Sequence, residues 1–354
     1  MEFWTTTHGL PAAVAEAAIS AEENGWDGLS VPYAPTMAPD PYVCLAAAAV
    51  ATDKLKVGTW VATPASHTPA SAAGSIKTVQ AVAEGRAVFA IGRGDSALAY
   101  LGMAPAPLGF FEAYVSRLRN YLQNEPQAFD YDLDGGGHFP PISGIGLAQG
   151  PTDARFGLHM EKIASVPLDM VATGPRVIGI AARHADYISF AVGADPTRIA
   201  WALDKAKTER ERAGVSRPVT YGAWVPVVVT DDLAAGRRML SGSVASMARF
   251  SAMHGKTVNL STEVDRKIYE NVHDAYEMQA HFREGSPQSK QLTEDFVDRF
   301  AIIGPVEHCV SRLQALVDLG MERFIISGAS VETTPDLAAA SDQKFTSEVI
   351  PALR

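Results

Sequence analysis

Residues 55–95, LKVGTWVATPASHTPASAAGSIKTVQAVAEGRAVFAIGRGD, contain two short apolar runs on either side of a longer amphipathic segment. The runs 55–63 and 87–92 are rich in β-branched side chains, which is typical of strands. The segment 68–86 between them has a helical pattern that ends at Gly85. A strand, a helix and a second strand in this order predict two parallel strands joined by a crossover helix.

The same alternation extends along the whole chain. We expect further strands at 2–7, 27–32, 168–173, 186–193, 218–230 and 322–328. We expect further helices at 11–25, 40–53, 108–124, 174–185, 195–214 and 305–320. Eight strands, each followed by helical sequence, predict an α/β fold with a closed (β/α)8 TIM barrel. A doubly wound open sheet is the competing architecture, but the short, apolar and evenly spaced strand runs favour the barrel.

Two regions exceed what a barrel requires. A minimal barrel takes about 250 residues, and the chain has 354. The surplus lies in 124–165, which contains a stretch rich in Gly, Asp and Pro, and in 231–300, which has a helical pattern. We therefore expect one barrel domain over 1–354, with insertions after strand 4 and around helix 7. The first insertion is expected to be a surface excursion.

The composition argues against several classes of partner and location. The formal net charge is −10 and no basic run stands out, which argues against nucleic acid and anionic membranes as partners. No apolar segment approaches the roughly 20 residues of a membrane-spanning helix, and the N-terminus has no secretory signal pattern. Cys44 and Cys309 lie in apolar helical segments without paired spacing, so we expect two buried thiols in a cytoplasmic protein.

In a (β/α)8 barrel the active site lies at the carboxyl ends of the strands. His8 follows the first expected strand and Tyr33 the second. The candidates at the next four strand ends are Trp60, Val61, His67, Gly92, Arg93, Gly94, Asp95, Thr173, Gly174, Val192 and Gly193. The turns at 173–174 and 192–194 each precede a helix that begins with proline. Free N–H groups at such helix starts bind anions, so the two turns predict a phosphate site.

The sequence lacks the patterns that mark several other types of site. The Gly92-Arg93-Gly94 turn lacks the third glycine and the downstream acid of a dinucleotide fingerprint. No Gly-x-Ser-x-Gly nucleophile turn is present. His8, His67 and Asp95 could share one rim as zinc ligands, but no His-x-His or His-x-x-Glu-His spacing occurs. We therefore expect no metal site.

Three blocks of sequence carry a resemblance to a known family. They are 55–95, VATGPRVIGIAARHADYISF at 171–190, and FAIIGPVEHCVSRLQALVDLGMERFIIS at 300–327. The chain resembles the bacterial luciferase-like superfamily of flavin- and deazaflavin-dependent enzymes. Within it, the chain is most similar to the coenzyme F420 branch, which includes methylenetetrahydromethanopterin reductase. In that branch strand 4 ends in Gly-x-Gly-Asp/Glu, which Gly92 to Asp95 match.

The resemblance implies a homodimeric oxidoreductase that transfers hydride between reduced F420 and a small organic substrate. Trp60-Val61 falls where the family has a non-proline cis peptide against the cofactor ring, and Asp95 falls on an acidic residue near the reacting face. The turn 172–174 falls on a contact with the phosphate and side chain of the cofactor. The cofactor-binding residues so implied are Trp60, Val61, Gly92, Arg93, Gly94, Ala172, Thr173, Gly174, Val192 and Gly193.

The chain departs from the family pattern after strand 2. Relatives commonly carry Asp-His there, and in the alcohol dehydrogenases this His is the base for alcohol oxidation, whereas this chain has Pro32-Tyr33. Tyr33, His8 or His67 would then donate a proton, with Asp95 as a further donor or orienting residue, which suits a reductase.

Other functions remain open at this point. The main alternative is a monooxygenase that uses reduced FMN and oxygen, since a Gly-Arg-Gly turn in relatives can hold the FMN phosphate. A non-catalytic flavin-binding barrel and a metal-dependent hydrolase are further alternatives.

Overall fold

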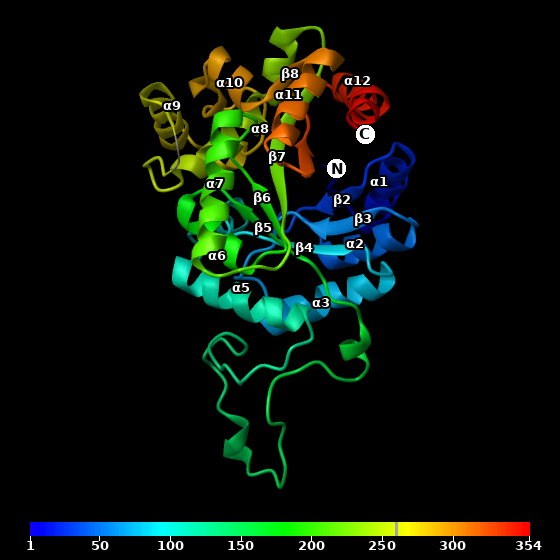
Figure 1. The fold of residues 1–354 in the computed structure, drawn as a ribbon, viewed down its shortest axis with the longest axis vertical. Coiled ribbons are helices and arrows are strands. Elements are labelled where there is room, and N and C mark those ends of the chain that lie inside the picture. Colours follow the sequence, from blue (N-terminus) through cyan, green and yellow to red (C-terminus); the bar gives the residue numbers. More distant parts are fainter. Residues whose placement is uncertain (259–260) are drawn as a thin grey trace.

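The predicted barrel is present in the structure, a computed structural model that describes residues 1–258 and 261–354. Its strands are β1 (Glu2–Thr6), β2 (Gly28–Val31), β3 (Lys56–Thr59), β4 (Ala87–Ile91), β5 (Leu168–Ala172), β6 (Tyr187–Phe190), β7 (Thr220–Val229) and β9 (Arg323–Ser327). They run parallel in the order β6-β5-β4-β3-β2-β1-β9-β7, and pairing of β6 with β7 closes the sheet (Figure 1). The (β/α)8 TIM barrel is confirmed.

Helices cover the outside of the barrel between successive strands (Figure 1). They are α1 (Pro11–Glu23), α2 (Pro41–Val50), α3 (Pro69–Val82), α5 (Leu108–Leu122), α6 (Pro175–His184), α7 (Pro196–Arg212) and α11 (Val306–Asp318), with a short α4 (Ser96–Ala99) after β4. Proline begins several of them, where its missing N–H costs nothing. Asp40 accepts a hydrogen bond from Tyr42 N at 2.9 Å, and Asp195 accepts one from Thr197 N at 2.8 Å. These caps determine where each strand-to-helix loop ends.

The structure contains several elements that differ from those predicted from the sequence. β8 (Ile302–Gly304) pairs with the far end of β7 and is too short to show a strand pattern in the sequence. The third strand ends at Thr59 rather than at residue 63, and an isolated bridge then joins Ala62 to Ile91. After β9 the chain forms α12 (Pro335–Lys344), a π-helical turn η6 (Phe345–Val349) and α13 (Ile350–Leu353), a region for which the sequence carried no prediction.

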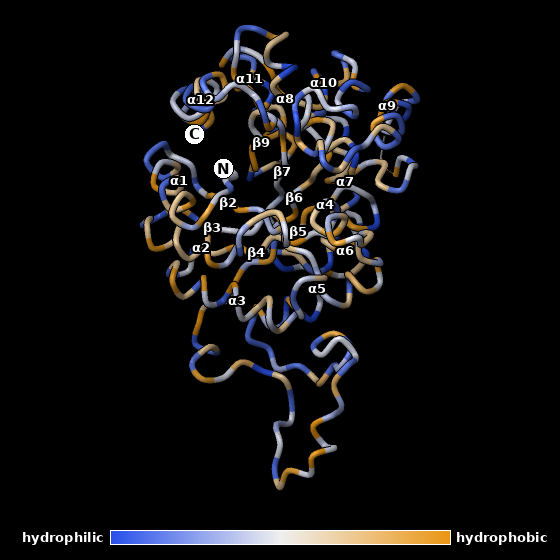
Figure 2. The backbone as a smooth tube through the Cα atoms, turned by 180° about the vertical axis from the view of Figure 1, so that it is seen from behind, coloured by the Kyte–Doolittle hydropathy of each residue, from blue (hydrophilic) through white to orange (hydrophobic). Residues whose placement is uncertain are grey.

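The two insertions differ in structure. The second forms α8 (Leu233–Arg249), α9 (Glu263–Asp274) and α10 (Glu294–Phe300), with short 3-10 turns between them, and packs on the body of the protein (Figure 1). The first lies between α5 and β5 and extends away from the barrel in both views (Figures 1 and 2). It contains the 3-10 turns η1 (Ile142–Ile145) and η2 (Met160–Lys162).

The barrel interior is filled near the starts of the strands. A Cβ built on Gly28 would lie 2.3 Å from the Trp4 ring, so this indole requires glycine on the neighbouring strand. The Arg323 guanidinium lies 4.1 Å from the Trp4 ring centre and 5.0 Å from that of Tyr187, and it forms a fully buried ion pair with Asp169. These side chains close one end of the barrel, and the open space lies at the other end.

Candidate active site

A cavity of about 510 Å³ lies at the carboxyl ends of the barrel strands. The sequence candidates that line it are Val61, Gly92, Arg93, Gly94, Asp95, Thr173 and Gly174. The other lining residues come from barrel elements and from the second insertion: Leu108, Val171, Pro175, Arg176, Val177, Ala191, Trp224, Phe250, Met253, His254 and Val258. A mostly apolar concavity with a few convergent polar groups is typical of a small-molecule site.

Two tryptophans lie together at this cavity. Trp224 lines it, and Trp60 packs edge to face against Trp224 with ring centres 5.2 Å apart. Both indoles are buried, and among the described residues neither Nε1 has a hydrogen-bond partner. Buried N–H donors are rarely left unpaired in a folded protein. Of the two indoles, Trp224 lines the cavity, whereas the predicted residue Trp60 only contacts Trp224 and does not itself line the cavity.

The backbone comes close to the cavity at two places. The Trp60–Val61 peptide bond is cis, and Val61 lines the cavity. A Cβ built on Gly92 would lie 3.5 Å from Val61 Cγ2, and Gly94 adopts a φ of +87°, which favours glycine. Val61 and the Gly92–Gly94 turn therefore lie next to each other at the rim.

One side of the cavity carries excess positive charge. Gly174 is the N-cap of α6 and makes no side-chain cap, so the first N–H groups of this helix have no capping side chain. Arg93 and Arg176 line the same cavity, and Arg93 Nε donates to the carbonyl of Ala106 at 2.7 Å. Burial, and then the nearby charge of Arg176, lower the pKa of Arg93. Two close cations beside a helix N-terminus favour a bound anion.

Asp95 is held by an arginine from the second insertion. Arg249 of α8 forms an ion pair with both carboxylate oxygens of Asp95, and its guanidinium lies 4.6 Å from the Tyr276 ring centre. The Tyr276 hydroxyl shares a hydrogen bond with His281 Nδ1 and lies 3.1 Å from Ser246 Oγ. Burial lowers the pKa of His281 to about 4, so this imidazole is neutral at pH 7. The network connects the β4 turn to the second insertion.

Tyr33 and His67 lie in a second cavity of about 300 Å³, beyond the ends of β2 and β3. The Tyr33 hydroxyl shares a hydrogen bond with His67 Nδ1, and Tyr114 donates to the His67 carbonyl at 2.9 Å. Burial raises the pKa of Tyr33 to about 12. Asp40 and Ser66 contribute further polar groups to this cavity. The structure thus brings two of the predicted proton donors together.

The other sequence candidates lie elsewhere. His8 is exposed and lines neither cavity. Ala172 and Val192 are buried without lining the large cavity. Gly193 has a φ of +80°, and a Cβ there would lie 2.8 Å from the Phe300 carbonyl oxygen, so this turn packs against α10.

The sequence analysis missed the groups that the second insertion brings to the site. Arg249, Tyr276 and His281 lie far from Asp95 along the chain and share no motif with it. No local signal marks them, because their partners become neighbours only when α8 and the following loop fold over the barrel.

The described part of the chain shows neither a cluster of metal ligands nor a membrane-spanning helix. Among residues 1–258 and 261–354, no cluster of three or more His, Cys, Asp or Glu side chains has an arrangement that could hold a metal ion. Within the same part of the chain, no helix is long and apolar enough to cross a membrane.

Comparison with known proteins gives a consistent set of relatives. The model of the luciferase-like monooxygenase family matches residues 3–323. A putative coenzyme F420-dependent oxidoreductase of Mycobacterium tuberculosis is 25% identical over 345 residues, covering 93% of this chain and 94% of the relative.

Solved structures show the same fold at lower identity. The coenzyme F420-dependent tetrahydromethanopterin reductase of Methanopyrus kandleri superposes with a TM-score of 0.72 at 18% identity, covering 100% of this chain and 99% of that one. An FMN-bound Baeyer-Villiger monooxygenase component of Pseudomonas putida superposes with a TM-score of 0.64 at 15% identity, covering 100% and 99%. Relatives of this fold therefore include both F420 and FMN enzymes.

Proposed function

Because this chain belongs to the luciferase-like monooxygenase family and is therefore an oxidoreductase, we propose that it transfers hydride between reduced F420 and a small organic substrate, acting as a reductase. Its F420-dependent relative in Mycobacterium tuberculosis matches nearly the full length of both chains, which supports the choice of cofactor. The two buried, unpaired cysteines suit a cytoplasmic enzyme.

The large cavity fits a flat ring that carries a phosphate on a side chain. Trp224 and Val61 line the cavity and would pack against the ring. Gly174 at the start of α6, with Arg93 and Arg176, would hold the phosphate. When bound, reduced F420 supplies a hydride ion to the substrate.

The chain itself supplies the proton that accompanies this hydride. Reduction of a C=O, C=N or C=C bond adds one hydride and one proton to the substrate. The Tyr33 hydroxyl, whose pKa burial raises to about 12, is protonated at pH 7 and would donate this proton. His67, hydrogen-bonded to that hydroxyl, orients it. Pro32-Tyr33 stands where relatives commonly carry Asp-His, the base for alcohol oxidation, and this departure is the observation that carries the choice of a reductase over an alcohol dehydrogenase.

Asp95 has an orienting role in this proposal. Arg249 contacts both of its carboxylate oxygens, so the carboxylate points in a defined direction at the cavity wall. The apolar walls contributed by Phe250, Met253 and Val258 exclude water from the reacting groups.

The second candidate is an FMN-dependent monooxygenase. The Gly92-Arg93-Gly94 turn favours it, because a Gly-Arg-Gly turn in relatives can hold the FMN phosphate, and this turn lines the cavity. An FMN-bound protein of the same fold also supports this alternative. Reduced FMN reacts with oxygen, whereas a deazaflavin passes hydride, so the two candidates differ in whether turnover consumes oxygen.

Cofactor titration distinguishes the candidates. The purified protein would be titrated with F420 and with FMN, and any cofactor released on denaturation would be identified by absorption and fluorescence. We expect F420 to bind and its reduced form to support anaerobic turnover. Selective binding of FMN with oxygen consumption would favour the monooxygenase, and binding of neither cofactor would contradict both candidates.

A substitution at Arg176 tests whether the phosphate of the cofactor binds at the start of α6. Replacing Arg176→Gln removes one of the two cations and is expected to weaken binding of the cofactor about tenfold, which corresponds to ~1.4 kcal/mol. Arg266→Gln on the exposed face of α9 is the matched control, since this arginine lies outside the cavity. Equal affinities for the two variants would argue against a phosphate at the start of α6.

A further inference from the structure

The second cavity, beyond the ends of β2 and β3, has walls that the proposed reaction uses only in part. Its volume of about 300 Å³ is at the lower end of the range for small-molecule sites. Tyr33 and His67 line it, and the proposed function gives a role to these two alone. The other lining residues are Ala34, Pro35, Ala38, Pro39, Asp40, Pro41 and Ser66. In the part of the chain that the structure describes, no Lys or Arg lines this cavity, and Asp40 supplies its one carboxylate.

Three aromatic rings lie at steep angles to one another in this wall. The rings of Tyr33 and His67 line the cavity, with centres 5.8 Å apart and planes 70° apart. Tyr42 packs edge to face against both, with its ring centre 6.1 Å from that of Tyr33 and 5.6 Å from that of His67. The face of an aromatic ring carries partial negative charge, and cages of such rings bind organic ammonium ions. The wall therefore favours a cation over an anion.

Asp40 places a negative charge beside these rings. Its Oδ1 accepts hydrogen bonds from Tyr42 N at 2.9 Å and from Val43 N at 3.1 Å, which cap α2, and Oδ2 takes part in neither bond. Burial raises the pKa values of Tyr33, Tyr42 and Cys44. The charge of Asp40 adds to the rise in each case. A carboxylate whose charge acts on several buried groups at a cavity with largely apolar walls attracts a cation into that cavity.

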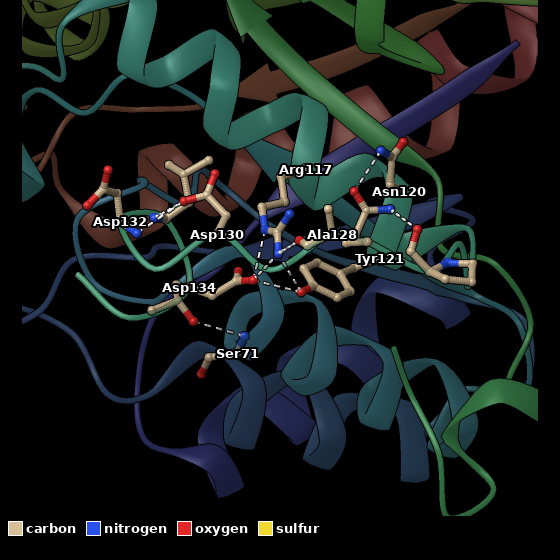
Figure 3. Close-up of polar contacts among 12 residues, drawn as sticks. Ser71, Arg117, Asn120, Tyr121, Ala128, Asp130, Asp132 and Asp134 are labelled. Carbon is tan, nitrogen blue, oxygen red and sulfur yellow. Dashed lines mark hydrogen bonds and ion pairs between the residues drawn. The ribbon is translucent and has the colours of Figure 1, made fainter. Parts of the chain in front are cut away.

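The helix α5 holds the cavity wall in place and pairs a second carboxylate close to it. Tyr114 of α5 donates to the His67 carbonyl at 2.9 Å. Burial raises the pKa of Tyr114, and the charge of Asp134 adds to this rise, so Asp134 lies near the same cluster. Further along the helix, Arg117 Nε donates to Asp134 Oδ2 at 2.8 Å (Figure 3). Because Asp134 has its own arginine, Asp40 is the carboxylate that a ligand in the cavity would meet.

The cavity also offers oxygen atoms that can accept hydrogen bonds from a ligand. Ser66 Oγ is buried and approaches the Tyr33 hydroxyl without completing a hydrogen bond. Together with Asp40 Oδ2 and the Tyr33 hydroxyl oxygen, it provides three acceptors at one cavity. An ammonium group has three N–H donors and no acceptor, so its hydrogen-bonding groups match this set.

We propose that the second cavity binds the ammonium group of a small organic amine, between the Asp40 carboxylate, Ser66 Oγ and the ring of Tyr33. The prolines and alanines that line the rest of the cavity would contact the carbon chain of the amine. A carboxylate or phosphate ligand would be repelled by Asp40, and a neutral alcohol would gain no ion pair. The inference is independent of the cofactor, since among the described residues none lines both cavities.

Titration with butylammonium, 1-butanol and butanoate tests the charge of the ligand. Each probe would be added to protein with ¹³C-labelled histidine rings, and the His67 ring signal, assigned by its loss in His67→Asn, would be followed by NMR. We expect saturable shifts of this signal with butylammonium, about tenfold weaker binding of 1-butanol, and no binding of butanoate. Equal affinities for butylammonium and 1-butanol, binding of butanoate, or an unchanged His67 signal would each overturn the proposal.

A substitution that keeps the helix cap separates the charge of Asp40 from its structural role. Asp40→Asn removes the charge and still caps α2, because asparagine and aspartate are comparable N-caps. We expect it to raise the dissociation constant of butylammonium about fivefold, as for loss of an ion pair that is partly open to water.

Asp195→Asn is the matched control for this substitution. Asp195 caps α7 directly before Pro196, as Asp40 caps α2 before Pro41, and it lines neither cavity. We expect its affinity for butylammonium to equal that of the unchanged protein. Equal affinities in the two variants would contradict the role of Asp40. Titration of both variants with F420 separates this outcome from that of the proposed function, because cofactor affinity should stay the same in each.

Discussion

At the residue scale, burial shifts the pKa values of a few side chains at the site. Tyr33 and His281 are both shifted by burial, in the directions expected for a phenol and an imidazole that lose contact with water. At pH 7 the Tyr33 hydroxyl is protonated, and His281 is a neutral ring beside Tyr276. Each shift leads to a prediction for one residue.

The first prediction concerns the proton donor. Tyr33→Phe removes the hydroxyl that is hydrogen-bonded to His67, and we expect kcat to fall by a factor on the order of 10² to 10⁴, as for loss of a general acid. Cofactor affinity should stay the same, because Tyr33 lines the other cavity. Tyr221→Phe is the control, since this tyrosine lies near the start of β7 and lines neither cavity. Equal kcat values in the two variants would show that Tyr33 is not the proton donor.

The second prediction concerns stability in acid. The folded-state pKa of His281 is about 4, below its ordinary value of 6.5, so the unfolded chain binds its proton more readily than the folded chain. The contribution to stability is complete above about pH 6.5 and is lost as the pH falls toward 4. We expect His281→Gln to reduce this loss by on the order of 1–3 kcal/mol, as measured by urea unfolding at neutral pH and at about pH 5. His138→Gln, at an exposed position of the first insertion, should leave the loss unchanged.

At the element scale, the structure explains which parts of the secondary structure the sequence predicts. The helices α2, α3 and α7 start at a side-chain cap followed by proline, and these local signals placed their starts correctly. β8 was missed because three residues give no periodicity and its pairing with β7 is a tertiary contact. The turn after β6 packs against α10 in the structure, a contact between distant parts of the chain that the sequence did not predict.

The third prediction tests that packing. Gly193→Ala puts a Cβ 2.8 Å from the Phe300 carbonyl oxygen at a φ of +80°. We expect it to destabilise the protein by about 2–4 kcal/mol, from backbone strain and overpacking together. Gly214→Ala has a φ of +66° with no atom within 4 Å, so only the backbone cost of about 1 kcal/mol applies. Thermal unfolding of both variants would show the difference, and equal losses would mean that the contact with α10 is unimportant.

At the scale of the whole molecule, the barrel is closed by contacts between distant parts of the chain. β1 pairs with both β2 and β9, and the buried ion pair between Arg323 and Asp169 joins β9 to β5 across the interior. Ser189 of β6 donates to the same carboxylate at 3.0 Å. This cluster fills the end of the barrel opposite the site.

The fourth prediction tests the cost of breaking this cluster. Arg323→Met leaves Asp169 buried without its counterion, and we expect a loss of about 3–5 kcal/mol in urea unfolding. Adding Asp169→Leu removes the unpaired carboxylate and is expected to recover part of the loss, because the burial of an isolated charge dominates it. If the double variant were less stable than Arg323→Met alone, the ion pair would not be the source of the effect.

The sequence by itself determined the barrel, and it predicted seven of the residues that line the large cavity at the carboxyl ends of the strands. These follow from local rules of periodicity, capping and turn formation, and from the general placement of active sites in this fold. Only the tertiary structure decided that Arg249 holds Asp95, that Tyr33 and His67 form a pair in a separate cavity, and that residues 250–258 complete the wall. The physical reason is distance along the chain, because side chains separated by tens to hundreds of residues acquire shared burial and charge only when the elements that carry them pack together.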